Sequence, residues 1–236
     1  MTTHIPGAVR HPRPKLESSP MARLLHIDSS SARDSVSRAL AVRFREVWDK
    51  EHGPDSVTYR DLVADPVPHL DGDAVVTLWS EPYTEAQRAT ATLQNRLVEE
   101  ILAADALLVS VPMYNWTVPS GLKAWLDQSL ILGRTLPYDP GHKPLGGRPA
   151  TVLTACGGYY GADVPEASMD HCRPYLATVL GQVLGYDLET ITVWRTLATA
   201  GQGDAQERRA AEESLRAGQE AAQARARAVA ASFGEV

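Results

Sequence analysis

Five serines and two arginines gather between residues 26 and 40, after a short apolar run and at the start of a helical pattern. The serines are Ser29, Ser30, Ser31, Ser35 and Ser37. Backbone N–H groups at a helix start lack partners and favour an anion, and serine hydroxyls add further donors. The stretch has neither a glycine-rich loop nor a Gly-Lys pair, so it differs from the common triphosphate-binding loop. We therefore expect an anion site suited to a monophosphate; the alternative is that one of the serines is simply an N-cap.

Two more loops have an unusual composition for surface turns. PMYNW, at residues 112–116, follows a run of apolar residues and presents two large aromatic side chains and an amide. Such a cluster suits a flat heteroaromatic ring, and the alternative makes Met113 and Trp116 plain core residues. TACGGYYG, at residues 154–161, has two adjacent glycines that permit close approach of the backbone to a ligand, or an ordinary tight turn.

No set of side chains in the sequence forms a catalytic nucleophile or an acid–base pair. Cys156 and Cys172 are the two cysteines, and without CxxC spacing or paired histidines they predict no zinc site, although a disulfide stays open. A cysteine phosphatase would need an arginine where Ala162 stands. Three histidines lie apart from other candidate groups and are interpreted as packing or surface residues: His26, His142 and His171. We therefore expect no catalytic side chain and no metal.

The composition is that of a soluble globular protein, with 236 residues of which 44% are hydrophobic and 22% charged. The net charge of −6 argues against nucleic acid or an anionic membrane surface as the main partner. No stretch approaches the roughly 18 apolar residues of a membrane span. Residues 1–22 carry four prolines and are expected to form a disordered leader before one domain over residues 23–236. The low cysteine content fits a reducing, cytoplasmic location.

The elements that must position these loops alternate along the chain. Apolar runs and alternating patterns predict five strands, at residues 23–28, 56–62, 106–111, 150–155 and 186–195. Helical spacing of apolar residues, or helix propensity, predicts five helices, from residue 36 to Gly53-Pro54 and at 84–102, 121–132, 166–184 and 204–232. Residues 133–149 form a long loop rich in proline and glycine, and a loop of that length is usually functional.

Repeated strand–helix alternation predicts an α/β fold, a three-layer sandwich with a five-stranded parallel sheet and helices on both faces. For the strand order 2-1-3-4-5, ligands bind where the order reverses, between the first and third strands. The loops after the first, third and fourth strands should then converge. These are the three loops with the unusual compositions.

This combination resembles the FMN-dependent NADH-azoreductases, or NADH:quinone oxidoreductases, of the flavodoxin-like superfamily, from about residue 22 to the end of the chain. PMYNW, followed by LK and an aromatic residue, is similar to the family's P-M-Y-N-F segment. The Ser-x-Ser pair at Ser35 and Ser37, six residues after Ser29, is similar to the family's phosphate loop. ACGG stands where the family usually has Ser-Arg-Gly-Gly, and PYL at residues 174–176 also fits.

The resemblance implies a set of FMN contacts. The phosphate would be held by Ser29, Ser35, Val36 and Ser37. The isoalloxazine would be lined by Met113, Tyr114, Asn115 and Trp116, with Pro112 before them, and its pyrimidine side by Ala155, Cys156, Gly157, Gly158 and Tyr160. Trp116 replaces the family's usual Phe, Cys156 replaces an arginine of several relatives, and Leu136 stands where many relatives have Phe. The last two departures bear on the choice of acceptor.

The activity that the resemblance implies is two-electron reduction by hydride transfer with ping-pong kinetics. NADH or NADPH would be the donor, and the acceptor a quinone, reduced to a hydroquinone, or an azo compound, reduced to amines in two cycles. The flavin would carry the chemistry. A second subunit would complete the site, giving a homodimer with part of the 133–149 loop at the joint. Two alternatives are a flavodoxin-type electron carrier without NAD(P)H oxidoreductase activity and a flavin-free scaffold of the same fold.

Overall fold

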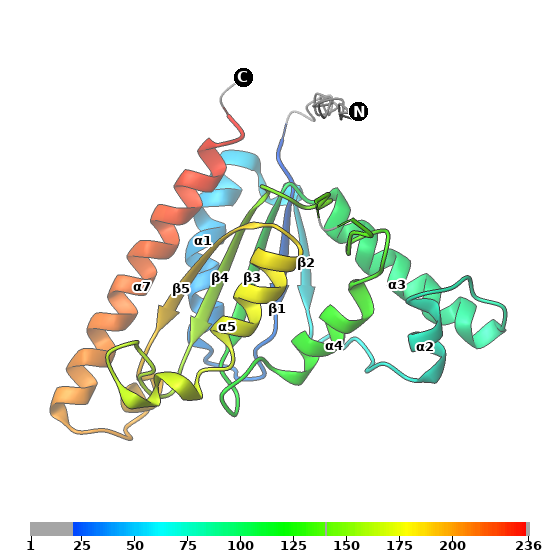
Figure 1. The fold of residues 1–236 in the computed structure, drawn as a ribbon. Coiled ribbons are helices and arrows are strands. Elements are labelled where there is room, and N and C mark those ends of the chain that lie inside the picture. The colour runs from blue at the N-terminus through cyan, green and yellow to red at the C-terminus, as the bar shows by residue number, and fades with distance from the viewer. Residues whose placement is uncertain (1–20, 140, 235–236) are drawn as a thin grey trace, which may run out of the picture.

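The computed structural model describes residues 21–139 and 141–234, and Figure 1 shows its fold. The leader predicted for residues 1–22 lies outside the described residues, apart from Met21 and Ala22. Ala22 is buried in the hydrophobic core, so ordered packing begins just before the first strand.

Five parallel strands form one sheet: β1 (Leu24–Asp28), β2 (Val57–Asp61), β3 (Ala106–Pro112), β4 (Pro149–Ala155) and β5 (Asp187–Val193). Their order is β2-β1-β3-β4-β5, which confirms the predicted order 2-1-3-4-5. Every residue of β1 and β3 is buried, as expected for central strands covered on both faces. The register sets Asp28 beside Asp61 on one side and Ser110 on the other, so three polar residues meet where these strands end.

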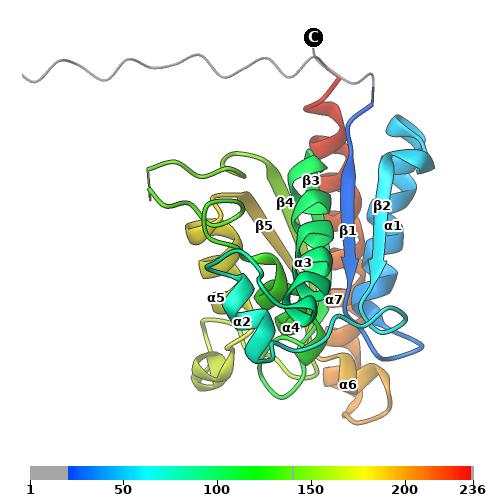
Figure 2. The ribbon, with the colours of Figure 1, turned by 90° about the vertical axis from the view of Figure 1, so that its right-hand side faces the viewer.

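Helices cover both faces of the sheet, as the sequence predicts (Figure 1). On one face lie α1 (Val36–His52) and α7 (Ala205–Ala231). On the other lie α3 (Glu85–Ala103), α4 (Ser120–Ser129) and α5 (Arg173–Leu176). Figure 2, turned by 90°, shows the sheet between these two helical layers. The carboxyl ends of the strands and the loops that follow them lie together at the lower edge in Figure 1.

The α1 face contains two of the largest fully buried side chains, and they fix α1 on the sheet. Phe44 and Trp48 are buried, and the Trp48 indole donates to Ser56 Oγ at 2.8 Å. On α7, a Cβ at Gly218 would lie 2.5 Å from a methyl of Val193, so this helix approaches β5 closely only because position 218 is glycine. Tight packing of α1 holds its first turn at the sheet's carboxyl edge.

Helix boundaries follow ordinary signals at most positions. Gly53, at φ 79°, ends α1 where the Gly-Pro pair predicts a break. Thr84 and Gln87 form a capping box at the start of α3, and Asp204 and Glu207 form another at the start of α7. The predicted C-terminal helix is confirmed, and it packs against α1 and the sheet.

The helix predicted for residues 166–184 is wrong in its first half. The structure has a short 3₁₀ helix, η2 (Pro165–Met169), and then a bend before α5 and the π-helical η3 (Ala177–Val183). The Asp170 carboxylate accepts the backbone N–H groups two and three residues later, at 2.9 and 3.0 Å. An aspartate that bonds its own neighbouring backbone competes with a continuous helix, and this breaks the predicted element.

Two short α-helices have no counterpart in the prediction: α2 (Gly72–Thr77), capped by Asp71, and α6 (Thr196–Thr199), directly after β5. Both are too short to give a periodic apolar pattern. None of the helices that the structure describes, including the 27-residue α7, is long and apolar enough to cross a membrane.

Candidate functional site

The loops after β1, β3 and β4 converge at the carboxyl edge of the sheet, as the predicted strand order requires. The N–H of Ser29 donates to the Ser110 carbonyl at 3.2 Å, and the N–H of Ser31 donates to the Tyr114 hydroxyl at 3.2 Å. The N–H of Met113 donates to the Ala155 carbonyl at 2.8 Å. We name residues 29–37 the first loop, 113–117 the second loop and 155–160 the third loop.

The first loop ends in a helix start with free donors. Ser35 is the N-cap of α1, and its hydroxyl accepts the N–H of Arg38 at 3.2 Å and lies 3.1 Å from Ser37 Oγ. Among the residues that the structure describes, no acceptor pairs with the backbone N–H groups of Val36 and Ser37. Because the 17-residue α1 directs its dipole through this point, the arrangement can bind an anion.

The earlier serines of the first loop are held differently. The Ser29 hydroxyl is buried and donates to the Ser110 carbonyl at 2.8 Å, so its proton is committed to β3. Ser30 Oγ accepts the N–H of Ala32 at 3.3 Å and lies 3.4 Å from the Tyr114 hydroxyl. These contacts shape the turn and join it to the second loop.

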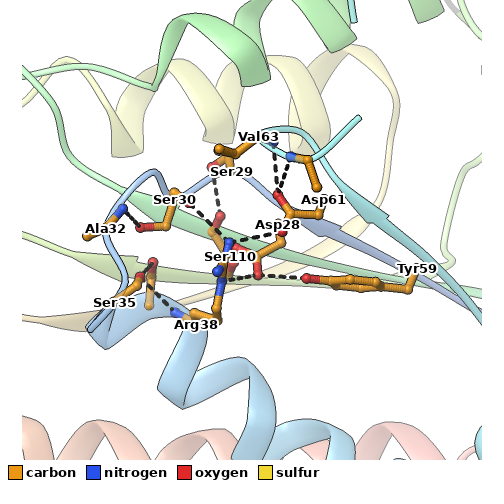
Figure 3. A network of polar contacts seen from close by, with 12 residues as sticks. Asp28, Ser29, Ser30, Ala32, Ser35, Arg38, Tyr59, Asp61, Val63 and Ser110 are labelled. Carbon is orange, nitrogen blue, oxygen red and sulfur yellow. Dashed lines mark hydrogen bonds and ion pairs between the residues drawn. The ribbon is translucent and has the colours of Figure 1, made fainter. Parts of the chain in front are cut away.

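A network of charged and polar side chains lies under the first loop (Figure 3). The fully buried Asp28 accepts from Arg38 Nε at 2.6 Å, from Ser110 Oγ at 2.6 Å and from the Tyr59 hydroxyl at 3.1 Å. Arg38 also pairs with Asp61 at 3.3 Å. Burial and then the nearby Asp28 carboxylate raise the pKa of Tyr59 to about 12, so it stays a hydrogen-bond donor.

The sequence interpretation missed this network. Its signals were an aspartate at the end of an apolar strand and a serine inside the otherwise apolar β3. A charge that interrupts a buried strand needs a partner, and the partner lies on a helix ten residues later in the chain.

His26 lies on β1 below this network, and its interpretation as a packing residue is confirmed. It is buried, its ring centroid lies 5.0 Å from that of Tyr59, and its ring nitrogens have no hydrogen-bond partner among the described residues. Burial lowers the pKa of His26 to about 4, against the opposing effect of Asp28. His26 is therefore neutral at pH 7.

The second loop is a tight turn with an exposed aromatic residue at its tip. Tyr114 and Thr117 exchange backbone hydrogen bonds of 3.1 Å, and the two residues between them have positive φ angles, 47° at Asn115 and 66° at Trp116. Two successive positive φ values are those of a type I′ turn. Trp116 is 45% exposed, so the alternative that it is a core residue is wrong, whereas Met113 packs partly against the core.

The third loop is held to the segment after β5. The N–H of Cys156 donates to the Val193 carbonyl at 2.8 Å, and the N–H of Thr196 donates back to the Cys156 carbonyl at 3.0 Å. A Cβ at Gly157 would lie 2.9 Å from the Leu197 side chain, so glycine lets the loop pass close to that residue. Arg173 donates to the Tyr160 carbonyl at 2.9 Å and fixes the far end of the loop.

Both cysteines are buried free thiols, so the disulfide that the sequence left open does not form. Burial raises the pKa of each thiol to about 12. A thiol in that state is inert as a nucleophile. Cys156 can therefore serve a ligand only through its backbone or as a small apolar contact.

Open cavities surround the three loops. One of about 570 Å³ is lined by Ser29, Ser31, Tyr114 and the chain after β2. One of about 590 Å³ is lined by Tyr114, Asn115 and the start of α4. The third loop borders a cavity of about 390 Å³. Among the described residues, no group of three or more His, Cys, Asp or Glu side chains could hold a metal ion.

Comparison with known proteins gives consistent findings. A family model for the flavodoxin-like fold matches residues 22–218. An FMN-dependent NADH:quinone oxidoreductase of Frankia alni is 40% identical over 211 residues, covering 88% of this chain and 100% of the relative. A protein of the same name from Frankia casuarinae is 44% identical over 181 residues, covering 75% and 86%. In the crystal structure of an azoreductase from Bacillus anthracis, the fold is similar with a TM-score of 0.74 at 23% identity, covering 87% of this chain and 99% of that one.

Proposed function

The chain belongs to the flavodoxin-like family, among the FMN-dependent NADH:quinone oxidoreductases, and from this we propose that it binds FMN and transfers electrons from NADH to quinones. Its curated relatives are named as enzymes, which favours this function over that of an electron carrier. The same relatives argue against a flavin-free scaffold.

The observation that carries the proposal is the meeting of an anion-binding helix start with an aromatic turn. The free N–H groups of Val36 and Ser37 and the paired hydroxyls of Ser35 and Ser37 suit a phosphate. Tyr114 belongs to the second loop and touches the first, so one ligand can span both. A ligand with a phosphate at one end and a flat ring at the other fits this donor set, and FMN is such a ligand.

The residues assigned to FMN lie in the three loops, apart from Pro112 at the end of β3. The phosphate contacts are Ser29, Ser35, Val36 and Ser37; the ring contacts are Pro112, Met113, Tyr114, Asn115 and Trp116; the pyrimidine contacts are Ala155, Cys156, Gly157, Gly158 and Tyr160. Two of these positions use their own donors inside the protein: the Ser29 N–H and hydroxyl both donate to the Ser110 carbonyl, and the Cys156 N–H donates to the Val193 carbonyl.

FMN, when bound, supplies the redox chemistry by taking up a hydride and releasing two electrons to an acceptor. The chain's own residues bind and orient: the first loop holds the anionic end, and the exposed Trp116 and the half-buried Tyr114 offer apolar walls to flat molecules. Donor and acceptor use the same place in turn, which predicts ping-pong kinetics. No side chain of the site is assigned a proton-transfer role.

The test is whether the purified protein is yellow, whether its chromophore is FMN, and whether NADH bleaches it without oxygen. We expect rapid bleaching and recovery of the colour on addition of a quinone. A colourless protein that does not bind FMN on titration would contradict the proposal. Bound flavin that NADH leaves oxidised would favour the electron carrier instead. The same assay with NADPH decides which donor is preferred.

Azo compounds are proposed as a second class of acceptor, supported by the fold shared with an azoreductase. Complete cleavage of an azo bond to two amines takes four electrons, so two NADH molecules should be oxidised for each dye molecule. Quinone reduction without any loss of dye colour would remove azo compounds from the proposal and leave the quinone activity intact.

We also propose a cytoplasmic homodimer. Three aromatic side chains are strongly exposed, Trp79 at 67%, Tyr83 at 74% and Tyr138 at 78%, and a cavity of about 470 Å³ lies between Trp79 and Tyr138. Tyr138 belongs to the loop expected at the joint, and such a patch supports an interface. Light scattering should give twice the chain's 25.6 kDa, and the variant Trp79→Glu/Tyr138→Glu should give one chain. Cell fractionation tests the location.

A further inference from the structure

Arg38 is the residue at which the contacts of three segments meet beneath the first loop (Figure 3). Its Nε bonds Asp28 at 2.6 Å, and its Nη2 donates to the Ser30 carbonyl at 3.1 Å and to Asp61 at 3.3 Å. Its backbone N–H donates to Ser35 Oγ at 3.2 Å. One side chain therefore ties the beginning of the first loop to the ends of β1 and β2, and its backbone ties the end of the loop to α1.

The anchor of this arrangement is the buried carboxylate of Asp28. The Asp28 side chain is 1% exposed, and hydrogen bonds from Ser110 and Tyr59 hold its carboxylate from two other strands. Arg38 is 32% exposed, so its guanidinium reaches from this buried carboxylate toward the surface. A planar guanidinium with several donors can span such a set of acceptors, and an ammonium cannot.

Charge gives Arg38 a second role. Asp28 and Asp61 place two carboxylates beneath the loop that is proposed to bind a phosphate, and these negative charges repel an anion. Arg38 forms ion pairs with both carboxylates. Without it, the field beneath the first loop would oppose an anion.

We propose that Arg38 is a positioning residue for the phosphate end of FMN, an inference that rests on the proposed function. It holds the first loop in its binding shape before the ligand arrives, which lowers the ordering cost of binding, and it offsets the carboxylates below. Within the site its direct contacts are with Ser30 and Ser35 of the first loop and not with the residues assigned to the ring. Riboflavin, which has the same ring and no phosphate, should therefore bind independently of Arg38.

The experiment titrates the apoprotein with FMN and with riboflavin and follows quenching of flavin fluorescence. Arg38→Met keeps the length of the side chain and removes the guanidinium. We expect FMN affinity to fall by about tenfold or more, as for loss of a charge-assisted contact, and riboflavin affinity to change by less than about twofold. The matched control is Arg45→Met, which removes an arginine of the same helix whose ion pair with Asp49 lies away from the loop; neither affinity should change.

Two further variants separate positioning from charge and from folding. Arg38→Lys keeps the positive charge, but an ammonium group cannot contact Asp28, Asp61 and the Ser30 carbonyl together. Its FMN affinity should therefore lie between those of Arg38→Met and the wild type. Asp28→Asn/Arg38→Met removes both partners, so it avoids leaving a buried carboxylate unpaired, and FMN should still lose affinity relative to riboflavin. This double variant carries the test if Arg38→Met does not fold.

The outcomes are distinct. Wild-type protein that binds neither flavin contradicts the proposed function itself. Wild-type binding of FMN with unchanged affinity in Arg38→Met overturns the inference and leaves the function standing. Equal losses for FMN and riboflavin also overturn it, because they indicate a general structural defect. Full recovery in Arg38→Lys overturns the positioning role and leaves only a charge effect.

Discussion

The first and second loops meet at Tyr114, yet they are held by different forces. The first loop rests on a buried carboxylate with three donors and on side-chain contacts from three strands. The second loop is held by the two backbone hydrogen bonds between Tyr114 and Thr117 and by the N–H of His171, which donates to the Trp116 carbonyl at 2.9 Å. One loop is supported from below by charge, and the other by the conformation of its own backbone.

The difference follows from what each loop would present. A loop that binds an anion must leave donors unpaired, so its stability has to come from groups beneath it. A loop that presents aromatic faces can satisfy its own backbone and needs only the correct turn. Residues 31–34 and residues 115–117 are all exposed, so in both loops the tip contributes little to the core. Substitutions below the first loop should therefore cost more stability than substitutions in the second loop.

The largest effect is expected at Asp28. Asp28→Asn removes the charge that Arg38 pairs with and replaces one of the two acceptor oxygens by an NH2 group that faces other donors. Breaking a buried, hydrogen-bonded pair from one side costs about 3–5 kcal/mol of the free energy of unfolding. Urea denaturation measures this value. Asp49→Asn, at a partly exposed ion pair on α1, is the control and should change it by less than about 1 kcal/mol. Equal effects at the two positions would show that the first loop does not depend on its buried charge.

The second-largest effect is a pH dependence of the free energy of unfolding, and it arises from His26 in β1, the strand that leads into the first loop. The pKa of His26 is lowered by burial to about 4 when folded and lies near 6.5 when unfolded. Between these values the unfolded chain binds a proton that the folded chain does not. The free energy of unfolding therefore falls as pH decreases through this window, by about 3 kcal/mol, and is fully retained above pH 6.5.

His26→Leu tests this dependence by removing the titrating ring. Denaturation of both proteins at several pH values between 4 and 7 should give a flatter curve for the variant. The charged groups around His26 are Asp28, Asp61, Arg38 and Arg45, and they are present in both proteins. Parallel curves for the two proteins would assign the pH dependence to these neighbours instead.

The third prediction concerns FMN binding at the first loop, and the expected change in binding free energy is smaller than the two changes in stability. Ser35→Glu places a carboxylate where the phosphate is assigned, so like-charge repulsion should lower FMN affinity by well over tenfold, or more than about 1.4 kcal/mol. Riboflavin affinity should change far less, because riboflavin lacks the phosphate. Flavin fluorescence titration measures both. If FMN binds the variant as tightly as wild type, Ser35 does not contact the phosphate.

The sequence predicts a parallel sheet covered on both faces, because this follows from the local alternation of strands and helices. The strand order 2-1-3-4-5 belongs to the flavodoxin-like fold that the sequence resembles, and the meeting of the loops follows from that order. It does not predict the network around Asp28. The contact between Asp28 and Ser110 joins residues 82 apart, and only the register of β1 with β3 sets them side by side. Such pairs leave no periodic signal in one sequence.

The missed details in the loops have local causes. Asp170 interrupts the predicted helix by capping the backbone, a competition that helix propensity does not weigh. The positive φ at Trp116 could not be expected, because bulky side chains disfavour that conformation; Asn115, which tolerates it, was the one hint of the turn.

The smallest effect is expected in the second loop, where it measures what the left-handed backbone conformation at Trp116 costs in stability. A left-handed conformation costs a residue with a Cβ about 1–2 kcal/mol, and glycine escapes that cost. Trp116→Gly should therefore be more stable than Trp116→Ala by about 1 kcal/mol, although glycine in an ordinary conformation is the less stable choice. Thr117, which is exposed and does not have a positive φ, is the control, and there alanine should be the more stable of the pair. Urea denaturation of the four variants gives both differences. If alanine were the more stable variant at both positions, the left-handed backbone conformation at position 116 would carry no cost. The second loop would then not be held by its backbone conformation in the way that the first loop is held by charge.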